Sequence, residues 1–108
     1  AEFPWENVKR MGELGLLGIP WPEELGGAGL DLTSYILAIH EMAKVDASHA
    51  ITISAHTTLG TSPIVAFGTA EQKARYVPLL ASGRVLGGFG LTEPDAGSDA
   101  GGTRTTAV

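Results

Sequence analysis

The sequence predicts a mainly α-helical domain followed by the first strands of a β domain. Apolar residues recur at helical spacing through most of residues 4–82. Capping residues and glycines divide this stretch into separate helices. From residue 85 onward the helical spacing is lost and β-branched residues become frequent. We therefore expect a helical domain over residues 1–84 and an incomplete β domain over residues 85–108.

The first helix is predicted over residues 4–17. Pro4 suits a first-turn position, where its missing N–H would have no helical partner. Val8, Met11 and Leu14 form one apolar stripe, and two glycines, Gly15 and Gly18, mark the end.

A long loop is predicted next, over residues 19–31. Pro20, Pro22 and the cluster Gly26-Gly27-Ala28-Gly29 disfavour a regular element there. The apolar residues Trp21 and Leu25 are expected to dock this loop onto the core.

The second helix is predicted to start between Leu32 and Ser34 and to end at a break over residues 46–48. Asp31, Thr33 and Ser34 are each able to cap its N-terminus. Its expected buried face comprises Tyr35, Ile36, Ile39, Met42 and Ala43.

A third helix is predicted over residues 49–59, with Ser48 as its cap and Gly60 as its end. Its Ala, Ser and Thr side chains allow neighbours to approach closely, which favours a central position. A short helix is expected to follow, starting at Ser62-Pro63 and ending at Gly68.

The last predicted helix begins at a capping box. In the run Thr69-Ala70-Glu71-Gln72, the Thr hydroxyl can accept from the Gln amide while the Gln side chain reaches back. Pro78 is expected to end or kink this helix, and one more turn is expected before Gly83.

Two strands are predicted beyond the helices, over residues 85–91 and 103–108. Val85, Phe89 and Leu91 would share one face of the first strand. Two strands with few partners are marginal by themselves, so the β domain is expected to be only begun.

Composition narrows the function classes. The 108 residues are 44% hydrophobic and 18% charged, which favours a packed domain over disorder. The net charge of −5 and the scattered basic residues argue against a nucleic-acid partner. The lack of cysteine excludes disulfides and thiol chemistry within the chain, and no apolar run approaches the length of a membrane span. No secretory signal is visible, and since the chain begins at Ala1 without methionine, we expect a processed or excised segment.

Residues 87–102 are the most informative stretch, which we call the glycine-rich segment. It holds six glycines, the hydroxyls of Thr92 and Ser98, and three carboxylates. Glycine lets the backbone approach a ligand closely, so this composition suits a large anionic cofactor held by main-chain amides. An ordinary interdomain turn has a similar composition, and the residues alone leave both readings open.

Several other sites fail on spacing or context. His49 and His56 lie seven residues apart, but a third metal ligand is lacking, so we expect packed or surface histidines and no metal. A calcium loop starting at Asp95 would need glycine at Ala100 and glutamate at Thr106. The run from Gly88 lacks the third glycine and the helix of a dinucleotide fingerprint. Ser98 lacks the flanking glycines of a hydrolase elbow, and no phosphate loop is present.

The chain resembles the acyl-CoA dehydrogenase family. LTEPDAGSD at residues 91–99 is similar to that family's flavin-binding signature. The resemblance extends back through most of the chain, in MGELGLLGI (11–19), PEELGGAGLD (22–31), GTAEQK (68–73) and YVPLLASG (76–83). It implies the family's N-terminal helical domain and the start of its middle β domain.

The resemblance implies non-covalent FAD and desaturation of an acyl-CoA thioester between Cα and Cβ. In that family a carboxylate removes the α-proton while a hydride passes to the flavin, which acts as the electron sink. The implied cofactor-binding residues are Phe89, Gly90, Leu91, Thr92, Gly97 and Ser98. Thr92 and the backbone beside it would bond the pyrimidine edge, while Gly97 and Ser98 would face the pyrophosphate. Ser98 would also lie near the substrate, and residues 59–65 would help to line the acyl pocket.

Some residues depart from the family pattern. Phe89 stands where many members have a hydroxylated aromatic residue, and Asp95 stands where a small residue is common. The family's catalytic base lies far downstream, so no catalytic residue is expected here and the chain alone is expected to be inactive. None of the carboxylates Glu13, Glu41, Glu71 and Glu93 is assigned to that role, and Glu93 is expected to hold the turn around Pro94.

The resemblance also implies partners and a setting. Family members are commonly tetramers that pass electrons to an electron-transfer flavoprotein, in the bacterial cytoplasm or the mitochondrial matrix. A flavin-dependent oxidase or monooxygenase of the same fold remains an alternative. So does a non-catalytic helical interaction module, although unpaired strand edges argue against it.

Overall fold

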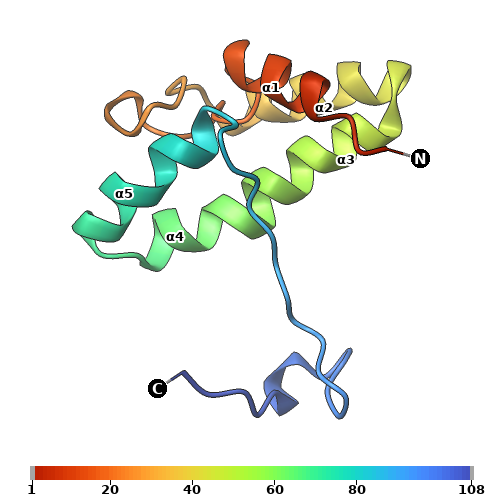
Figure 1. Cartoon of the computed structure of the whole chain (residues 1–108), viewed down its shortest axis with the longest axis vertical. Helices are drawn as coiled ribbons and strands as arrows, with labels where there is room; N and C mark the ends of the chain where they lie inside the picture. Colours follow the sequence, from red (N-terminus) through yellow and green to blue (C-terminus); the bar gives the residue numbers. More distant parts are fainter. Residues whose placement is uncertain (1, 108) are drawn as a thin grey trace.

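The computed structural model describes residues 2–107 and is built from helices. The α-helices of the described residues gather in one body, and the chain then leads away from the end of α5 to a small C-terminal loop region (Figure 1). Their bounds are α1 (Trp5–Glu13), α2 (Leu32–Val45), α3 (Ala47–Ala55), α4 (Ser62–Phe67) and α5 (Ala70–Ala81). Three shorter segments join them: 3-10 turns η1 (Glu23–Leu25) and η3 (Ala100–Gly102), and the π-helical η2 (His56–Thr61). The mainly α prediction is confirmed.

The predicted strands are wrong. No strand forms within residues 2–107, and Val108, the end of the second prediction, lies outside the described residues. Across the described chain, β-type pairing is limited to one isolated bridge between Glu93 and Ala96. The two extended segments do not pair with each other, and a strand exists only as part of a hydrogen-bonded ladder.

Helix α1 is shorter than predicted. Gly15 adopts a left-handed conformation with φ of 76°, so the chain turns soon after Glu13. Val8 and Met11 are buried as predicted, but Leu14 is 59% exposed. The reversal brings Leu17 into the core in its place.

The loop over residues 19–31 is confirmed, apart from the single turn η1. It folds back on itself, since the Ala28 amide donates to the Gly18 carbonyl at 2.9 Å and the Leu30 amide to the Ile19 carbonyl at 3.0 Å. Trp21 and Leu25 are half-buried, as expected for docking residues.

Helix α2 starts at the Asp31 cap, whose carboxylate accepts from the Ser34 amide at 2.8 Å. Tyr35 is buried, and Ile39 and Met42 pack partly buried against the core. The predictions for Ile36 and Ala43 are wrong because both are exposed. Successive residues lie about 100° apart around a helix, so Ile36 points well away from the side that carries Tyr35. The buried face of α2 is therefore narrower than predicted.

Helices α3 and α4 form one run through η2. Asp46, rather than Ser48, caps α3, and accepts from the Ser48 and His49 amides at 2.8 and 3.2 Å. Gly60 does not end the helix, and Ser62 makes no side-chain cap. The helix continues through Gly60 in the wider π-helical form of η2. The combined helical run ends at Gly68, as predicted.

Helix α5 starts at the predicted capping box. The Gln72 amide donates to the Thr69 hydroxyl at 3.2 Å, and the Thr69 amide donates to the Gln72 side chain at 2.8 Å. Pro78 lies inside the helix without ending it, and the chain turns at Gly83 with φ of 71°. The hydrophobic core lies between these elements and comprises Val8, Met11, Leu17, Ile19, Tyr35 and Ile53. Within residues 2–107, none of the helices has the length and apolar character needed to cross a bilayer.

Candidate functional site

The glycine-rich segment leaves the helical body as extended chain and ends in a closed loop (Figure 1). Between these parts, residues 88–92 have no regular structure. Within the described chain their backbone amides donate no hydrogen bond, and the Thr92 hydroxyl has no partner. Phe89 is 54% exposed and Leu91 43% exposed. This run therefore presents unpaired backbone donors and an unpaired hydroxyl to its surroundings.

The loop is closed by Glu93. Its carboxylate accepts from the backbone amides of Arg104 at 2.8 Å and Thr105 at 3.0 Å. Glu93 and Ala96 also exchange backbone hydrogen bonds around Pro94. Hydrogen bonding from the Arg104 amide, and then from the side chain and amide of Thr105, lowers the pKa of Glu93, because it stabilises the charged form. Glu93 therefore holds the turn, as the sequence predicted.

Gly97 and Ser98 lie on the exposed part of this loop. A Cβ added at Gly90 or Gly97 would meet nothing within 4 Å. The turn at residues 93–96 thus separates the six predicted cofactor-binding residues into two groups, residues 89–92 before it and residues 97–98 after it. Both groups are open to contact from outside the described chain.

The start of the segment is held by a buried histidine. The ring of His56 lies with Nε2 3.1 Å from the Leu80 carbonyl, while the Gly87 amide donates to Nδ1 at 3.0 Å. Burial lowers the pKa of His56, and the bond to Leu80 only partly opposes this shift. The sequence indicated only a packed or surface histidine here, because the two partners of His56 lie 24 and 31 residues away along the chain.

His49 belongs to a different cluster. Its Nδ1 lies 2.8 Å from the Asp46 carboxylate and its Nε2 lies 2.9 Å from the Asn7 side chain. These contacts join α1 to the start of α3. Within residues 2–107, no group of three potential metal ligands forms around either histidine.

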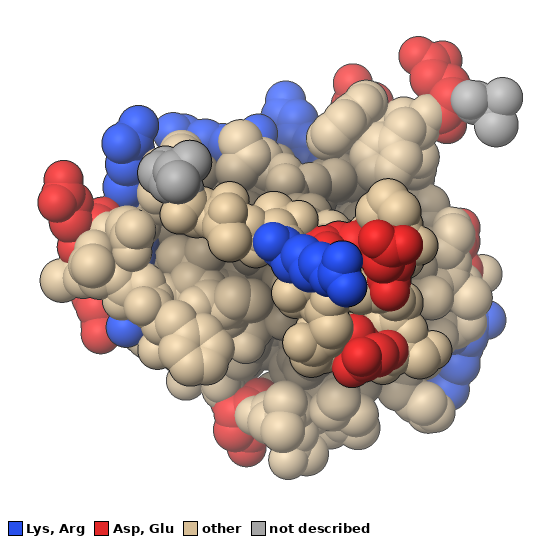
Figure 2. Space-filling model, turned by 90° about the horizontal axis from the view of Figure 1, so that it is seen from below, with Lys and Arg blue, Asp and Glu red and all other residues tan. Residues whose placement is uncertain are grey.

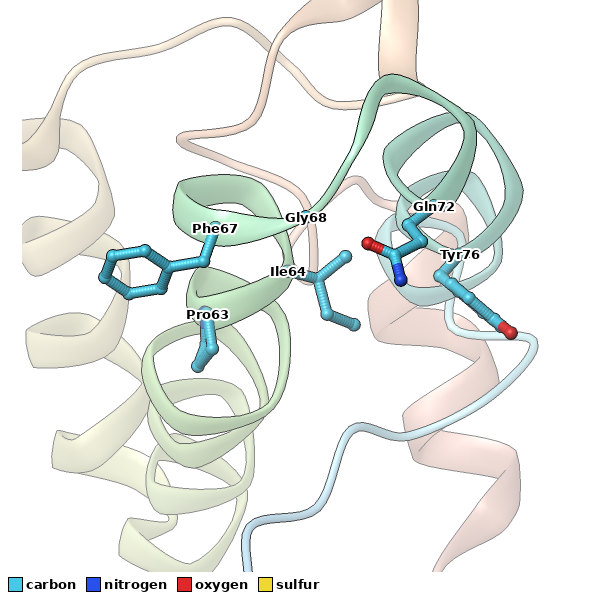
Figure 3. A pocket seen from close by; sticks show the side chains of 6 residues that line it. All are labelled: Pro63, Ile64, Phe67, Gly68, Gln72 and Tyr76. Carbon is cyan, nitrogen blue, oxygen red and sulfur yellow. The ribbon is translucent and has the colours of Figure 1, made fainter. Parts of the chain in front are cut away.

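A hollow of about 400 Å³ lies between α4 and α5. It is lined by Pro63, Ile64, Phe67, Gly68, Gln72 and Tyr76. Figure 3 shows Ile64 directed toward Gln72 and Tyr76, while the Phe67 ring points away from α5. Pro63 and Ile64 belong to the stretch 59–65, which was expected to contact an acyl chain.

Charged residues form no large patch of one sign on the face shown in Figure 2. Basic and acidic side chains lie there in small groups, some of them side by side, within a mostly uncharged surface.

The family model of the acyl-CoA dehydrogenase N-terminal domain matches residues 1–84. The chain belongs to this family. The match ends before the glycine-rich segment, but similarity to individual members of the family continues through it. A curated relative, the acyl-CoA dehydrogenase of Bacillus subtilis strain 168, is 57% identical over 107 residues, which are 99% of this chain and 28% of the relative.

Solved structures are similar over nearly the same part of the chain. The acyl-CoA dehydrogenase of Bacillus anthracis, solved in complex with FAD, matches with a TM-score of 0.85 and 48% identity, over 92% of this chain and 17% of that one. A structure reported for the electron transferring flavoprotein of Acidaminococcus fermentans matches with a TM-score of 0.88 and 51% identity, over 94% of this chain and 27% of that one. The chain thus spans between 17% and 28% of the length of these similar proteins.

Proposed function

We propose that this chain is the N-terminal part of an FAD-dependent acyl-CoA dehydrogenase, with the helical domain over residues 1–84 and the start of the β domain over residues 85–108. The relatives that carry this name are similar across almost the whole chain. The observation that carries the proposal is the run of residues 88–92, whose backbone donors have no partner in the described chain.

These residues fit a flavin by their chemistry. The flavin ring presents carbonyl oxygens and ring nitrogens, which backbone amides and hydroxyls can bond. Residues 89–92 would lie along the flavin ring, and the backbone of Leu91 and Thr92, with the Thr92 hydroxyl, would bond its pyrimidine edge. Gly97 and Ser98 would receive the pyrophosphate, where the absence of a Cβ at Gly97 allows close approach. When bound, FAD supplies the two-electron acceptor for the oxidation of the substrate.

The substrate is proposed to be an acyl-CoA thioester. Ser98 would contact it beside the cofactor, and residues 59–65 would line the acyl pocket. The hollow between α4 and α5 supports only the second assignment, because Pro63 and Ile64 line it. The base that removes the α-proton is proposed to lie outside residues 1–108.

The partners and the setting are also proposals. An electron-transfer flavoprotein is the proposed electron acceptor, in a tetramer of the bacterial cytoplasm or the mitochondrial matrix. The structure reported for such a flavoprotein supports the acceptor, because it contains a chain similar to this one.

The test uses the full-length protein that contains this chain. Purification should yield bound FAD, and anaerobic addition of an acyl-CoA should bleach its absorption. Bleaching followed by rapid peroxide formation in air would instead favour the oxidase, and a protein that takes up no FAD would contradict the proposal. The 108-residue chain alone, mixed with FAD and acyl-CoA, should show no turnover.

A further inference from the structure

The His56 ring accepts a hydrogen bond from the amide of Gly87, the residue directly before the run 88–92. We propose that His56 is a positioning residue, which orients residues 88–92 toward the cofactor through its hydrogen bond with Gly87. This inference rests on the proposed function, because it concerns the same cofactor. His56 itself would touch neither cofactor nor substrate.

The two hydrogen bonds of the ring define its protonation. The Leu80 carbonyl can only accept, so Nε2 carries the proton, and the Gly87 amide can only donate, so Nδ1 is unprotonated. The ring is 2% exposed and both of its nitrogens are engaged. A rotated or protonated ring would lose the bond to Gly87.

A close backbone contact holds Gly87 from a second direction. A Cβ added at Gly60 would lie 2.6 Å from the Gly87 Cα, so only glycine fits at this contact. Gly60 and His56 both belong to η2, whose wider register is reinforced by the bond from the Thr61 hydroxyl to the His56 carbonyl at 2.9 Å. Single π-helical turns inside α-helices frequently occur at functional sites.

Residues 88–92, the run proposed to face the flavin, lie between two hydrogen-bonded positions, which we call the upstream and downstream anchors. Upstream, Gly87 is bonded to His56, and downstream, Glu93 is bonded to Arg104 and Thr105. Between them the described structure gives the amides of residues 88–92 no partner. Loss of the upstream anchor would therefore leave these residues free to shift as a group, while the residues themselves remain intact.

Two substitutions separate the two bonds of the ring. In His56→Asn, the side-chain oxygen can take the place of Nδ1 and accept from Gly87. In His56→Gln, the side-chain nitrogen can take the place of Nε2 and donate to Leu80, but the bond to Gly87 is lost. A purely structural role would make the two variants similar, whereas a positioning role makes His56→Asn the one that retains function.

The experiment compares both variants in the full-length, flavin-loaded protein at equal FAD content. His56→Gln should lower kcat by about tenfold or more, since small misplacements of reacting groups cost up to about 100-fold, and it should shift the flavin absorption spectrum. KM for acyl-CoA should change much less. His56→Asn should retain the spectrum and a kcat within about twofold of the wild type.

Equal kcat and spectra in the two variants would overturn the inference, whether both were impaired or both unchanged. Thermal unfolding of each variant gives the fraction of folded protein at the assay temperature. The kcat of each variant is then calculated per folded molecule. A wild-type protein that binds no FAD would overturn the proposed function as well, and is recognised before any variant is made. The two failures are therefore distinguishable.

Discussion

The Glu93 carboxylate and the Arg104 backbone amide, eleven residues apart, lie 2.8 Å from each other and close the C-terminal loop. The neighbouring Thr105 amide bonds the second carboxylate oxygen at 3.0 Å. One side chain thus replaces the ladder that two paired strands would supply.

Replacement of Glu93 is expected to open this loop. In Glu93→Ala both amides lose their acceptor, so hydrogen exchange at Arg104 and Thr105 should accelerate to the rate of the neighbouring exposed amides. Asp95→Ala is the matched control, because it removes a nearby exposed carboxylate to which no hydrogen bond is assigned. Unchanged protection in Glu93→Ala would contradict this role.

Acid should open the same loop. The pKa of Glu93 is lowered in the folded chain by the amides of Arg104 and Thr105, so the carboxylate stabilises the loop fully above its unfolded pKa, near 4.5. This stabilisation should be lost as pH falls below 4.5 and through the lowered value. The chemical shifts of the two amides, followed by NMR from pH 6 to acid, should report the transition, and Glu93→Gln should abolish it.

Gly60→Ala should destabilise the helical body and displace the glycine-rich segment. The added Cβ would lie 2.6 Å from the Gly87 Cα, and such overpacking costs about 1–3 kcal/mol. Gly88→Ala is the control, since its Cβ meets nothing within 4 Å, and its cost should stay within about 0.5 kcal/mol. Urea unfolding measures both, and similar midpoints would contradict the importance of this contact.

Thr69→Ala should weaken the start of α5. The substitution removes the acceptor of the Gln72 amide, and loss of an N-cap costs about 1 kcal/mol. Thr33→Ala, at an exposed site in α2, should change stability by less than about 0.5 kcal/mol. Thermal unfolding of the two variants at equal concentration measures both losses of stability. An equal loss in Thr33→Ala would contradict the prediction.

Thr92→Val tests the proposed flavin contact in the full-length protein. Valine retains the shape of threonine but lacks the hydroxyl, and one hydrogen bond contributes about 0.5–1.5 kcal/mol, so FAD should bind about 2–12 times more weakly. Thr106→Val, at an exposed position beyond the loop, should bind FAD as the wild type does. FAD titration followed by fluorescence gives both affinities.

Local signals in the sequence predicted the helical body well. The capping box at Thr69 and Gln72, the stop at Gly68 and the turn at Gly83 depend on residues within a few positions of each other. Pattern reasoning can recognise such short-range chemistry. The cap of α3 was predicted wrongly, because Ser48 and Asp46 both have capping side chains and Asp46, two residues earlier, accepts the amide hydrogen bonds.

Features that depend on distant residues could not be predicted. Gly60 was predicted to end a helix, but in the structure it lies within η2, and Gly87, 27 positions later, occupies the space that a Cβ at residue 60 would fill. The partners of His56 are similarly remote. The strand predictions failed for the same reason, since extended chain becomes a strand only beside a partner. The flavin-binding residues came from resemblance, and they remain predictions.

Because only two residues connect α4 to α5, a small tilt of α5 at this turn would move the far end of the helix. Gly68 and Thr69 complete the reversal, and Leu80 lies ten residues along the helix from its first residue, Ala70. At a rise of 1.5 Å per residue, the distance along the helix from Ala70 to Leu80 is about 15 Å. A tilt of about 10° at the turn would therefore move the Leu80 carbonyl by about 3 Å. That displacement exceeds the tolerance of its bond to His56. An insertion or a lost cap at this turn would therefore displace the far end of α5 and weaken the bond between the Leu80 carbonyl and His56.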